Sequence, residues 1–271
     1  MKVLSKTYVA LVLAILYIPI LILMLFSFNS TNNTGVFTGF SLYWYKELFR
    51  SAETFDALKN TLILAVSSAV ISTLIGTAAS LGLDRMRSKF LRTTVNSVTN
   101  IPMMNPDIVT GISMMLLFVF VGTAVGSTEK LNFWTLLIAH VTFSLPYVIL
   151  SVLPKIKQMD KHLTEAAMDL GCTPLQSFFK VEFPCIMPGI ISGMLMAFTL
   201  SLDDFLISYF VTGSGFQTLP IYIYSAVRKG VRPTLYAANT IIIIAVLVLL
   251  ILINFVGDSD TKQKAKKEKK N

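Results

Sequence analysis

The sequence predicts an all-α, polytopic membrane protein with six transmembrane helices, and three observations support this class. Of the 271 residues, 54% are hydrophobic and only 14% are charged, whereas soluble domains carry about 25% charged residues. The mean hydropathy is +0.68. Several intervals without charge reach the length of roughly 20 apolar residues that a membrane span needs. With 14 Gly, 10 Pro and 2 Cys, the composition excludes collagen-like, disordered and disulfide-scaffold proteins.

The spans are predicted from the intervals between charged residues, taken in chain order. The first interval is longer than the apolar region of a signal peptide, and no small-residue cleavage pattern follows it. We therefore expect the first span to stay in the mature chain. The six expected spans are Thr7 to Phe28, Asn60 to Leu83, Ile101 to Gly122, Leu131 to Leu153, Cys185 to Phe210 and Leu235 to Val256.

The orientation follows from the distribution of Lys and Arg, which gather on the cytosolic side of membrane proteins. If the N-terminus is inside, the inner segments hold 16 of the 23 basic residues. Both termini are therefore expected to be cytosolic, with a transmembrane domain at 1–257 and a basic cytosolic tail at 258–271. The net charge of +8 then reflects topology and attraction to anionic lipid, and no nucleic-acid partner is expected.

Several kinds of chemistry are absent from the sequence. No G-x-x-x-x-G-K-[ST] loop is present, so the chain cannot hold nucleotide phosphates in that manner and is not expected to be an ATPase. The two histidines, His140 and His162, are 22 positions apart in the sequence, so no metal site is expected. We predict no catalytic residues. Gly189 and Gly193 form a G-x-x-x-G pattern, which favours close packing of helices.

The segment 160–184, between the fourth and fifth spans, predicts two short helices joined by a tight bend. Asp160 can cap the first helix, and Gly171 can end it in a left-handed conformation. Thr173 can cap the second helix with Pro174 at its first position, and Pro184 then turns the chain into the fifth span. The pattern alone also fits a hairpin that lies on the lipid surface. The apolar positions are Leu163, Ala166, Ala167 and Leu170, then Leu175, Phe178 and Phe179.

Three aspartates fall within the predicted spans, where an ionised side chain costs about 2.5 to 3.5 kcal/mol at the centre. Asp107 begins the third span, and Asp203 and Asp204 lie in the fifth. On a straight helix Asp204 shares a face with small and polar residues, and Asp203 projects about 100° away. Because the spans contain no Lys or Arg, the simplest interpretation is an acidic pathway for a cationic solute. The alternative is that both acids lie at the outer interface or in hydrogen bonds between helices.

Aromatic residues follow the first span at Tyr43, Trp44 and Tyr45. Their rings can contact cations and methylene groups, which favours Trp44 as a further pathway residue. Trp44 can equally anchor the chain at the membrane interface. Both interpretations stay open at this point.

The loop also carries a motif of fixed spacing. Glu165, Ala166, Ala167 and Gly171 are followed after nine residues by Val181 to Pro184. This pattern resembles the E-A-A signature of the membrane subunits of ATP-driven, binding-protein-dependent importers, with Val181 for Ile and Phe183 for Leu. The resemblance implies the architecture of a type I ABC importer permease. It also implies that Glu165, Ala166, Ala167 and Gly171 couple the chain to an ATP-binding subunit, expected in two copies.

A second resemblance covers nearly the whole chain and concerns the cargo. Four segments are similar to the PotC-type permeases of spermidine/putrescine importers. This family implies a second permease subunit, an extracytoplasmic polyamine-binding protein, ATP bound only by the partner subunit, and a bacterial cytoplasmic membrane. Two alternatives stay open: the same architecture serving a phosphonate, thiamine or iron, and an ATP-independent carrier for cations. The segments are Asn100 to Ser113, His140 to Pro146, Phe198 to Asp204 and Phe210 to Gly213.

Overall fold

The computed structural model describes residues 2–32, 35–128, 130–160, 162–213, 215–229, 233–248 and 251. These residues are nearly all helical, which confirms the all-α prediction, and one isolated bridge joins Asn29 to Phe40. The chain divides into two compact units. The first unit comprises Met1–Lys59 and Thr218–Val248, and the second comprises Asn60–Gln217 and Leu249–Asn271.

The first unit contains the N-terminal helix and the last described helices. Its core consists of four buried residues, Leu48, Ala57, Leu219 and Ala238. Thr54 Oγ1 donates a hydrogen bond to Tyr222 Oη at 3.0 Å and joins two of its helices. The unit holds α1 (Lys2–Phe26), α2 (Tyr43–Arg50), the first turns of α3 (Ala52–Arg85), α11 (Leu219–Lys229) and the helix Pro233–Val248.

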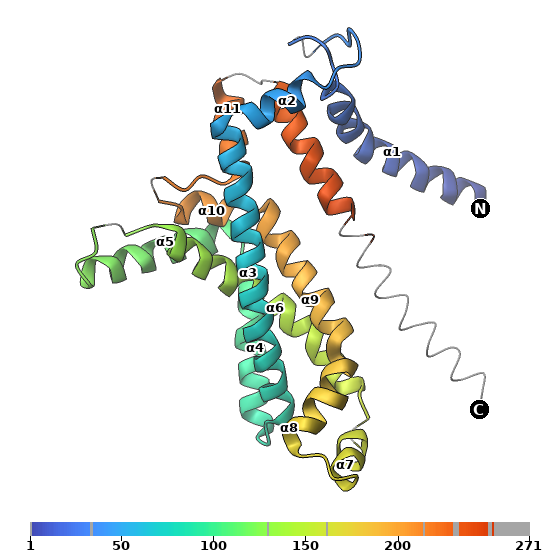
Figure 1. Ribbon diagram of the computed structural model, residues 1–271, viewed down its shortest axis with the longest axis vertical. Coiled ribbons are helices and arrows are strands. Elements are labelled where there is room, and N and C mark those ends of the chain that lie inside the picture. Colours follow the sequence, from blue (N-terminus) through green and yellow to red (C-terminus); the bar gives the residue numbers. More distant parts are fainter. Residues whose placement is uncertain are drawn as a thin grey trace. The chain divides into compact units, whose positions relative to one another are not determined.

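The second unit is built around α6 and α9, which pack along each other (Figure 1). The helix α4 also packs on α6, and the short α10 packs on both α5 and α6. Apart from the rest of α3, the unit holds α4 (Lys89–Met104), α5 (Asp107–Ala124), α6 (Phe133–Gln158), α7 (His162–Asp169), α8 (Pro174–Ser177), the π-helix η1 (Phe178–Glu182), α9 (Phe183–Asp203) and α10 (Leu206–Val211).

The contact between α6 and α9 depends on the two glycines of the G-x-x-x-G pattern. A Cβ atom on Gly189 would lie 2.8 Å from Lys155 Cγ and 2.9 Å from the Ser151 carbonyl oxygen. A Cβ atom on Gly193 would lie 3.3 Å from Ser151 Cβ. The predicted close packing is therefore confirmed, because any larger side chain at Gly189 would push the helices apart.

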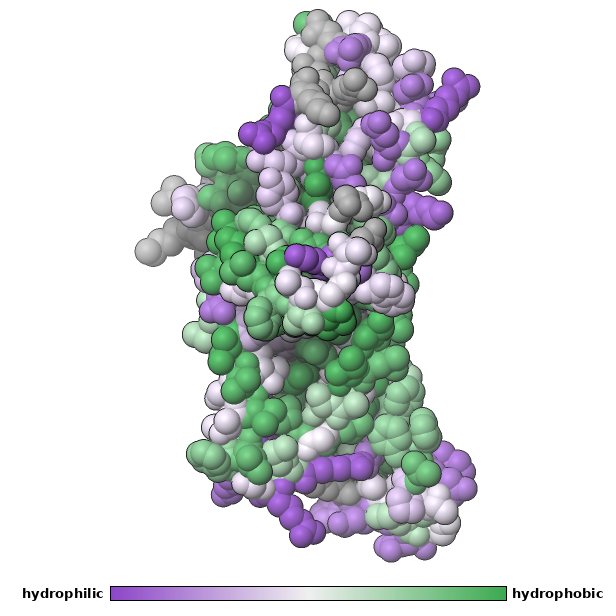
Figure 2. Space-filling view, turned by 90° about the vertical axis from the view of Figure 1, so that its left-hand side faces the viewer, coloured by the Kyte–Doolittle hydropathy of each residue, from purple (hydrophilic) through white to green (hydrophobic). Residues whose placement is uncertain are grey.

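Five of the described helices are long and apolar enough to cross a membrane, by length and composition. They correspond to the first five predicted spans, but they cover the third and the fifth only in part. The predicted sixth span, Leu235 to Val256, is described as a helix only over Pro233–Val248, which is shorter than a full span. Its remainder, apart from residue 251, and the predicted tail 258–271 lie outside the described residues. On the face drawn in Figure 2, hydrophobic residues cover the middle, and hydrophilic residues gather at the end that carries α7.

Two of the predicted spans are interrupted in the structure. The third was expected to be continuous from Ile101, but α4 ends at Met104 and α5 begins at Asp107. Pro106 explains this break, because a proline disfavours helical geometry in the residue before it, and Asn105 is extended. The fifth was expected to reach Phe210, but α9 ends at Asp203. Asp204 is extended, and α10 begins two residues later.

Candidate functional site

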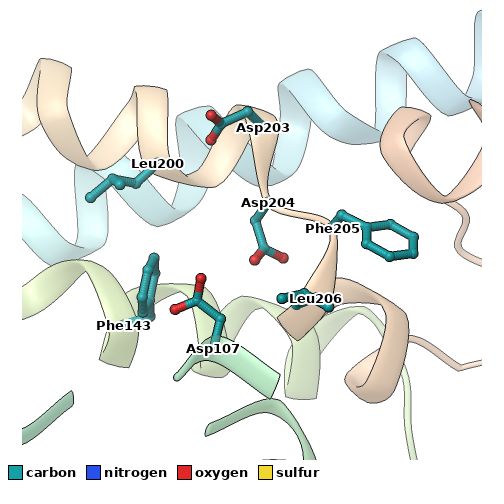
Figure 3. A pocket seen from close by; sticks show the side chains of 7 residues that line it. All are labelled: Asp107, Phe143, Leu200, Asp203, Asp204, Phe205 and Leu206. Atoms are coloured by element: carbon teal, nitrogen blue, oxygen red, sulfur yellow. The ribbon is translucent and has the colours of Figure 1, made fainter. Parts of the chain in front are cut away.

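The three predicted aspartates line one cavity of about 330 Å³ (Figure 3). Asp107 comes from the start of α5, Asp203 from the end of α9, and Asp204 from the link to α10. None of the lining residues is basic, so the cavity attracts cations. The other lining residues are Phe143, Leu200, Phe205 and Leu206.

Asp204 is held by the helix that follows it. Its Oδ1 accepts a hydrogen bond from the Ile207 N–H at 3.3 Å, and its Oδ2 accepts one from the Ser208 N–H at 2.8 Å. These bonds cap α10 and explain why the helix breaks here without a glycine or proline. The side chain is only 7% exposed, and its Oδ2 lies 3.5 Å from His140 Nε2.

His140 links Asp204 to a buried chain of hydroxyl groups. Its Nδ1 hydrogen-bonds Ser201 Oγ at 2.7 Å, and its Nε2 hydrogen-bonds Ser208 Oγ at 3.0 Å. Ser201 Oγ in turn accepts a hydrogen bond from Ser68 at 2.9 Å. This network joins α3, α6, α9 and α10, and a satisfied buried network of this kind fixes one geometry.

The contact of His140 with Asp204 was not predicted from the sequence, where His140 was considered only as a possible metal ligand. A usable signal was present, because histidine counts among the ionisable residues that are rare in membrane spans. Ser201, Asp204 and Ser208 lie at spacings of three and four, so they were already predicted to share one face. A buried histidine opposite that face is a suitable partner, but its place on α6 depends on the tertiary fold.

The carboxylates of Asp107 and Asp204 point toward the space between them, and Asp203 turns its carboxylate away from that of Asp204 (Figure 3). This divergence agrees with the prediction that Asp203 and Asp204 do not hold one ammonium together. Asp107 is exposed at the N-terminus of α5, where the helix dipole favours an acid. Close packing of α5 on α10 sets its position, because a Cβ atom on Gly111 would lie 3.1 Å from Phe210 Cδ2.

Trp44, the fourth predicted pathway residue, belongs to the first unit. Its Nε1–H donates a hydrogen bond to the Asn29 carbonyl oxygen at 2.7 Å. Its ring also meets Tyr43 edge to face, with 5.0 Å between the centroids. Both contacts give Trp44 a structural role within that unit, and a role in the pathway stays a prediction.

The segment 160–184 forms the predicted pair of short helices. Asp160 Oδ1 accepts a hydrogen bond from the His162 N–H at 3.0 Å and begins α7. Gly171 has φ +91°, the left-handed conformation that ends the helix. Thr173 and Gln176 form a capping box at α8, with hydrogen bonds of 3.1 and 3.3 Å. One detail differs from the prediction: η1 carries the helical backbone directly into α9 without a turn at Pro184.

The loop exposes several apolar side chains among its polar ones. Ala167 is buried, but its neighbours Glu165 and Ala166 are exposed. Leu170, at the bend, is 87% exposed. The exposed apolar side chains of the loop are Leu163, Ala166, Met168, Leu170, Leu175 and Phe179, and exposed polar ones include His162, Glu165, Asp169, Gln176 and Lys180.

Comparison with known proteins finds polyamine permeases among the relatives of the chain. The PotI permease of the putrescine transport system of Escherichia coli K12 is 41% identical over 231 residues, covering 85% of this chain and 82% of that protein. The PotC permease of the spermidine/putrescine transport system of the same strain is 37% identical over 261 residues, covering 96% of both chains. PotC of Haemophilus influenzae is 37% identical over 92% of this chain and 94% of its own.

Solved structures agree with the fold. A bacterial ABC transporter involved in the import of alginate has a chain with a TM-score of 0.71 and 17% identity, covering 96% of this chain and 94% of that one. The MetNI methionine ABC transporter has a chain with a TM-score of 0.54 and 19% identity, covering 79% and 98%. Residues 72–260 match the family model described as the binding-protein-dependent transport system inner membrane component. The chain therefore belongs to this family of transport-system membrane components, with polyamine permeases among its relatives.

Proposed function

We propose that this chain is the pore-forming permease subunit of an ATP-driven importer of polyamines. The observation that carries the proposal is the cavity in which Asp107, Asp203 and Asp204 meet without a basic lining residue. The printed functions of the relatives, transport of putrescine and of spermidine/putrescine, support the same cargo.

The chemistry of the cavity suits a polyamine, which alternates ammonium groups with methylene segments. Asp107 and Asp204 face one space, so one ammonium can pair with both carboxylates. Phe143 lines the cavity and can offer its ring to cations and methylenes. Asp203 adds negative charge at the edge, where a second ammonium can be attracted without contact to the first pair. A solute without positive charge gains nothing from these groups.

The exposed apolar side chains of the loop, Leu163, Leu170 and Leu175 among them, support a docking role toward ATP-binding subunits. A pair of permeases would dock two such subunits. In this proposal Glu165, Ala166, Ala167 and Gly171 form the coupling element. ATP binds and is hydrolysed only on those partner subunits, so the chain itself transports without being an enzyme. An exposed leucine such as Leu170 then becomes covered on assembly.

The separation of the two parts of the site fits a bilayer. The loop leads into the start of α9 and the cavity lies at its end, 21 residues later. A helix of that length spans about 30 Å, which is the thickness of the hydrocarbon core. With the loop in the cytosol, the cavity opens toward the outer side, where an extracytoplasmic binding protein would deliver the solute. We further propose six spans, cytosolic termini, a second permease subunit, and a bacterial cytoplasmic membrane.

The test is reconstitution of the full complex with its ATP-binding subunits, second permease and binding protein in liposomes. We expect ATP hydrolysis and uptake to be stimulated by binding protein loaded with putrescine or spermidine. Thiamine, a phosphonate and ferric iron are tested in the same assay as alternative solutes. Stimulation by one of these and not by polyamines would refute the cargo. Polyamine uptake that persists with an ATP-binding subunit unable to hydrolyse ATP would refute the ATP-driven mechanism.

A further inference from the structure

Glu182 lies where three elements of the second unit meet. It is the last residue of η1, directly before α9. Its Oε2 accepts a hydrogen bond from Arg85 Nη2 at 2.8 Å, and Arg85 is the last residue of α3. Its Oε1 accepts a longer one from Thr164 Oγ1 on α7 at 3.4 Å. One carboxylate therefore contacts the end of a long helix, the start of a second and the short helix of the loop.

The burial of Glu182 makes these contacts consequential. Its side chain is 11% exposed, whereas that of Arg85 is 64% exposed. A carboxylate removed from water needs its hydrogen-bond partners, because loss of one leaves a buried charge without compensation. Arg85 also lies at the C-terminus of α3, where the helix dipole favours a cation. Both effects hold the guanidinium against Glu182, although its outer side stays in solvent.

Close packing is incomplete at the same place. A cavity of about 540 Å³ lies between the end of α3 and the loop, with Arg85, Thr164 and Glu182 among its lining residues. Thr164 is held from a second side, because its carbonyl oxygen accepts a hydrogen bond from Ser177 Oγ at 3.3 Å. With a gap between the apolar surfaces, polar contacts and not packing set the position of α7 relative to α3.

We propose that Arg85, Glu182 and Thr164 form a positioning link that makes the coupling loop move together with α3 and α9. The link rests on the proposed function in one respect: α7 must be the element on which the ATP-binding subunit acts. Movement of α7 then reaches α3 through the ion pair and α9 through the backbone of η1. These residues contact neither the solute nor ATP.

The test compares variants in the assembled complex by two measurements. The first is hydrogen exchange of the α7 amides without any solute, and the second is polyamine uptake per ATP hydrolysed. Glu182→Gln and Arg85→Gln should each speed exchange in α7 by about tenfold, because local opening is easier without the link. Uptake per ATP should fall at least threefold. The charge-reversed double variant Arg85→Glu with Glu182→Lys should restore much of both, since it rebuilds an ion pair.

Arg87→Gln is the matched control. It removes a positive charge two residues from Arg85, and Arg87 is exposed with no ion pair to the part of the chain that the structure describes. Thr164→Val keeps the shape of the side chain and removes only the hydroxyl contact, so its effect should lie between the control and Glu182→Gln. Copurification of the partner subunits checks that every variant assembles.

Three results would overturn the link. The first is exchange and coupling in Glu182→Gln equal to those of Arg87→Gln. The second is a charge-reversed variant no better than its single changes, which would mean that the two residues do not act on each other. The third is faster exchange with unchanged uptake per ATP, which would refute the role in coupling. Exchange is measured without solute, so a wrong cargo would leave this comparison intact.

Discussion

Asp204 in the cavity and Glu182 beside the loop are both carboxylates largely removed from water, but their partners differ. Asp204 accepts hydrogen bonds from two backbone N–H groups and lies beside His140. Glu182 is paired with the guanidinium of Arg85. Backbone donors orient a carboxylate without cancelling its charge, whereas an arginine balances it. The difference separates an acid that can still attract a cation from one whose charge is used within the protein.

The same contrast predicts different kinds of failure. Changes around Asp204 should weaken the attraction for solute and raise the KM for uptake. Changes around the loop should leave that KM near its normal value and lower the polyamine uptake per ATP hydrolysed. The following variants test whether the two regions separate in this way.

The largest effect is expected at Gly171, on the loop side of the comparison. Its φ of +91° costs a β-branched residue about 1 to 3 kcal/mol, so Gly171→Val should reshape the bend and abolish uptake. Gly171→Asn is the matched control, since asparagine tolerates this conformation, and it should keep most of the uptake. A Cβ atom at Gly171 would meet no other atom within 4 Å, so a steric clash does not explain a difference between the two variants.

Uptake and ATP hydrolysis of the reconstituted complex provide the measurement, with partner copurification as the assembly check. Normal uptake by Gly171→Val would mean that the bend is not needed for coupling. An Asn variant as inactive as the Val variant would mean that the backbone conformation is not the cause.

The next largest effect is expected for Asp204→Asn, on the cavity side. The variant removes the charge that faces Asp107 and also weakens the cap of α10. The KM for a polyamine should therefore rise by more than tenfold, which corresponds to a loss of more than about 1.4 kcal/mol of binding free energy. Asp107→Asn isolates the charge, because Asp107 is exposed and holds no comparable cap. It should raise the KM by about tenfold. A wild-type KM in both variants would remove the cavity from the solute pathway.

A smaller effect is expected for His140→Ala, which should raise the KM severalfold by releasing Asp204. In a double-mutant cycle with Asp204→Asn the two effects should be less than additive, because they act on one network. Ser144→Ala is the matched control, since Ser144 is buried one turn further along α6 and its hydroxyl has no hydrogen-bond partner within the described chain. Fully additive effects would show that His140 acts independently of Asp204.

The two regions also differ in how much the sequence could predict. The caps at Asp160 and Thr173 and the stop at Gly171 are local signals, so the helices of the loop could be predicted almost residue by residue. The three aspartates could be identified because charges are rare in apolar spans. The break at Asp204 could not, because no glycine or proline marks it and the position of this carboxylate beside His140, 64 positions away in the sequence, depends on the tertiary fold. The ion pair of Glu182 with Arg85 was also missed, because the two residues are far apart in the sequence. Both lie in segments that look polar and solvated, so neither was singled out.

The smallest effect is expected for Asp203→Asn, and it sharpens the comparison within the cavity. Asp203 lines the cavity but turns its carboxylate away from that of Asp204 (Figure 3), so it acts on the solute only through its field. Because Asp203 is exposed, salt screens this field, with a Debye length of about 10 Å at 0.1 M. We therefore expect a two- to fourfold rise in KM at low ionic strength that shrinks as salt is added. The KM ratio between variant and wild type, measured in proteoliposomes over a series of salt concentrations, checks this. A rise as large as that of Asp204→Asn, and insensitive to salt, would mean that Asp203 contacts the solute directly and that its orientation changes during transport.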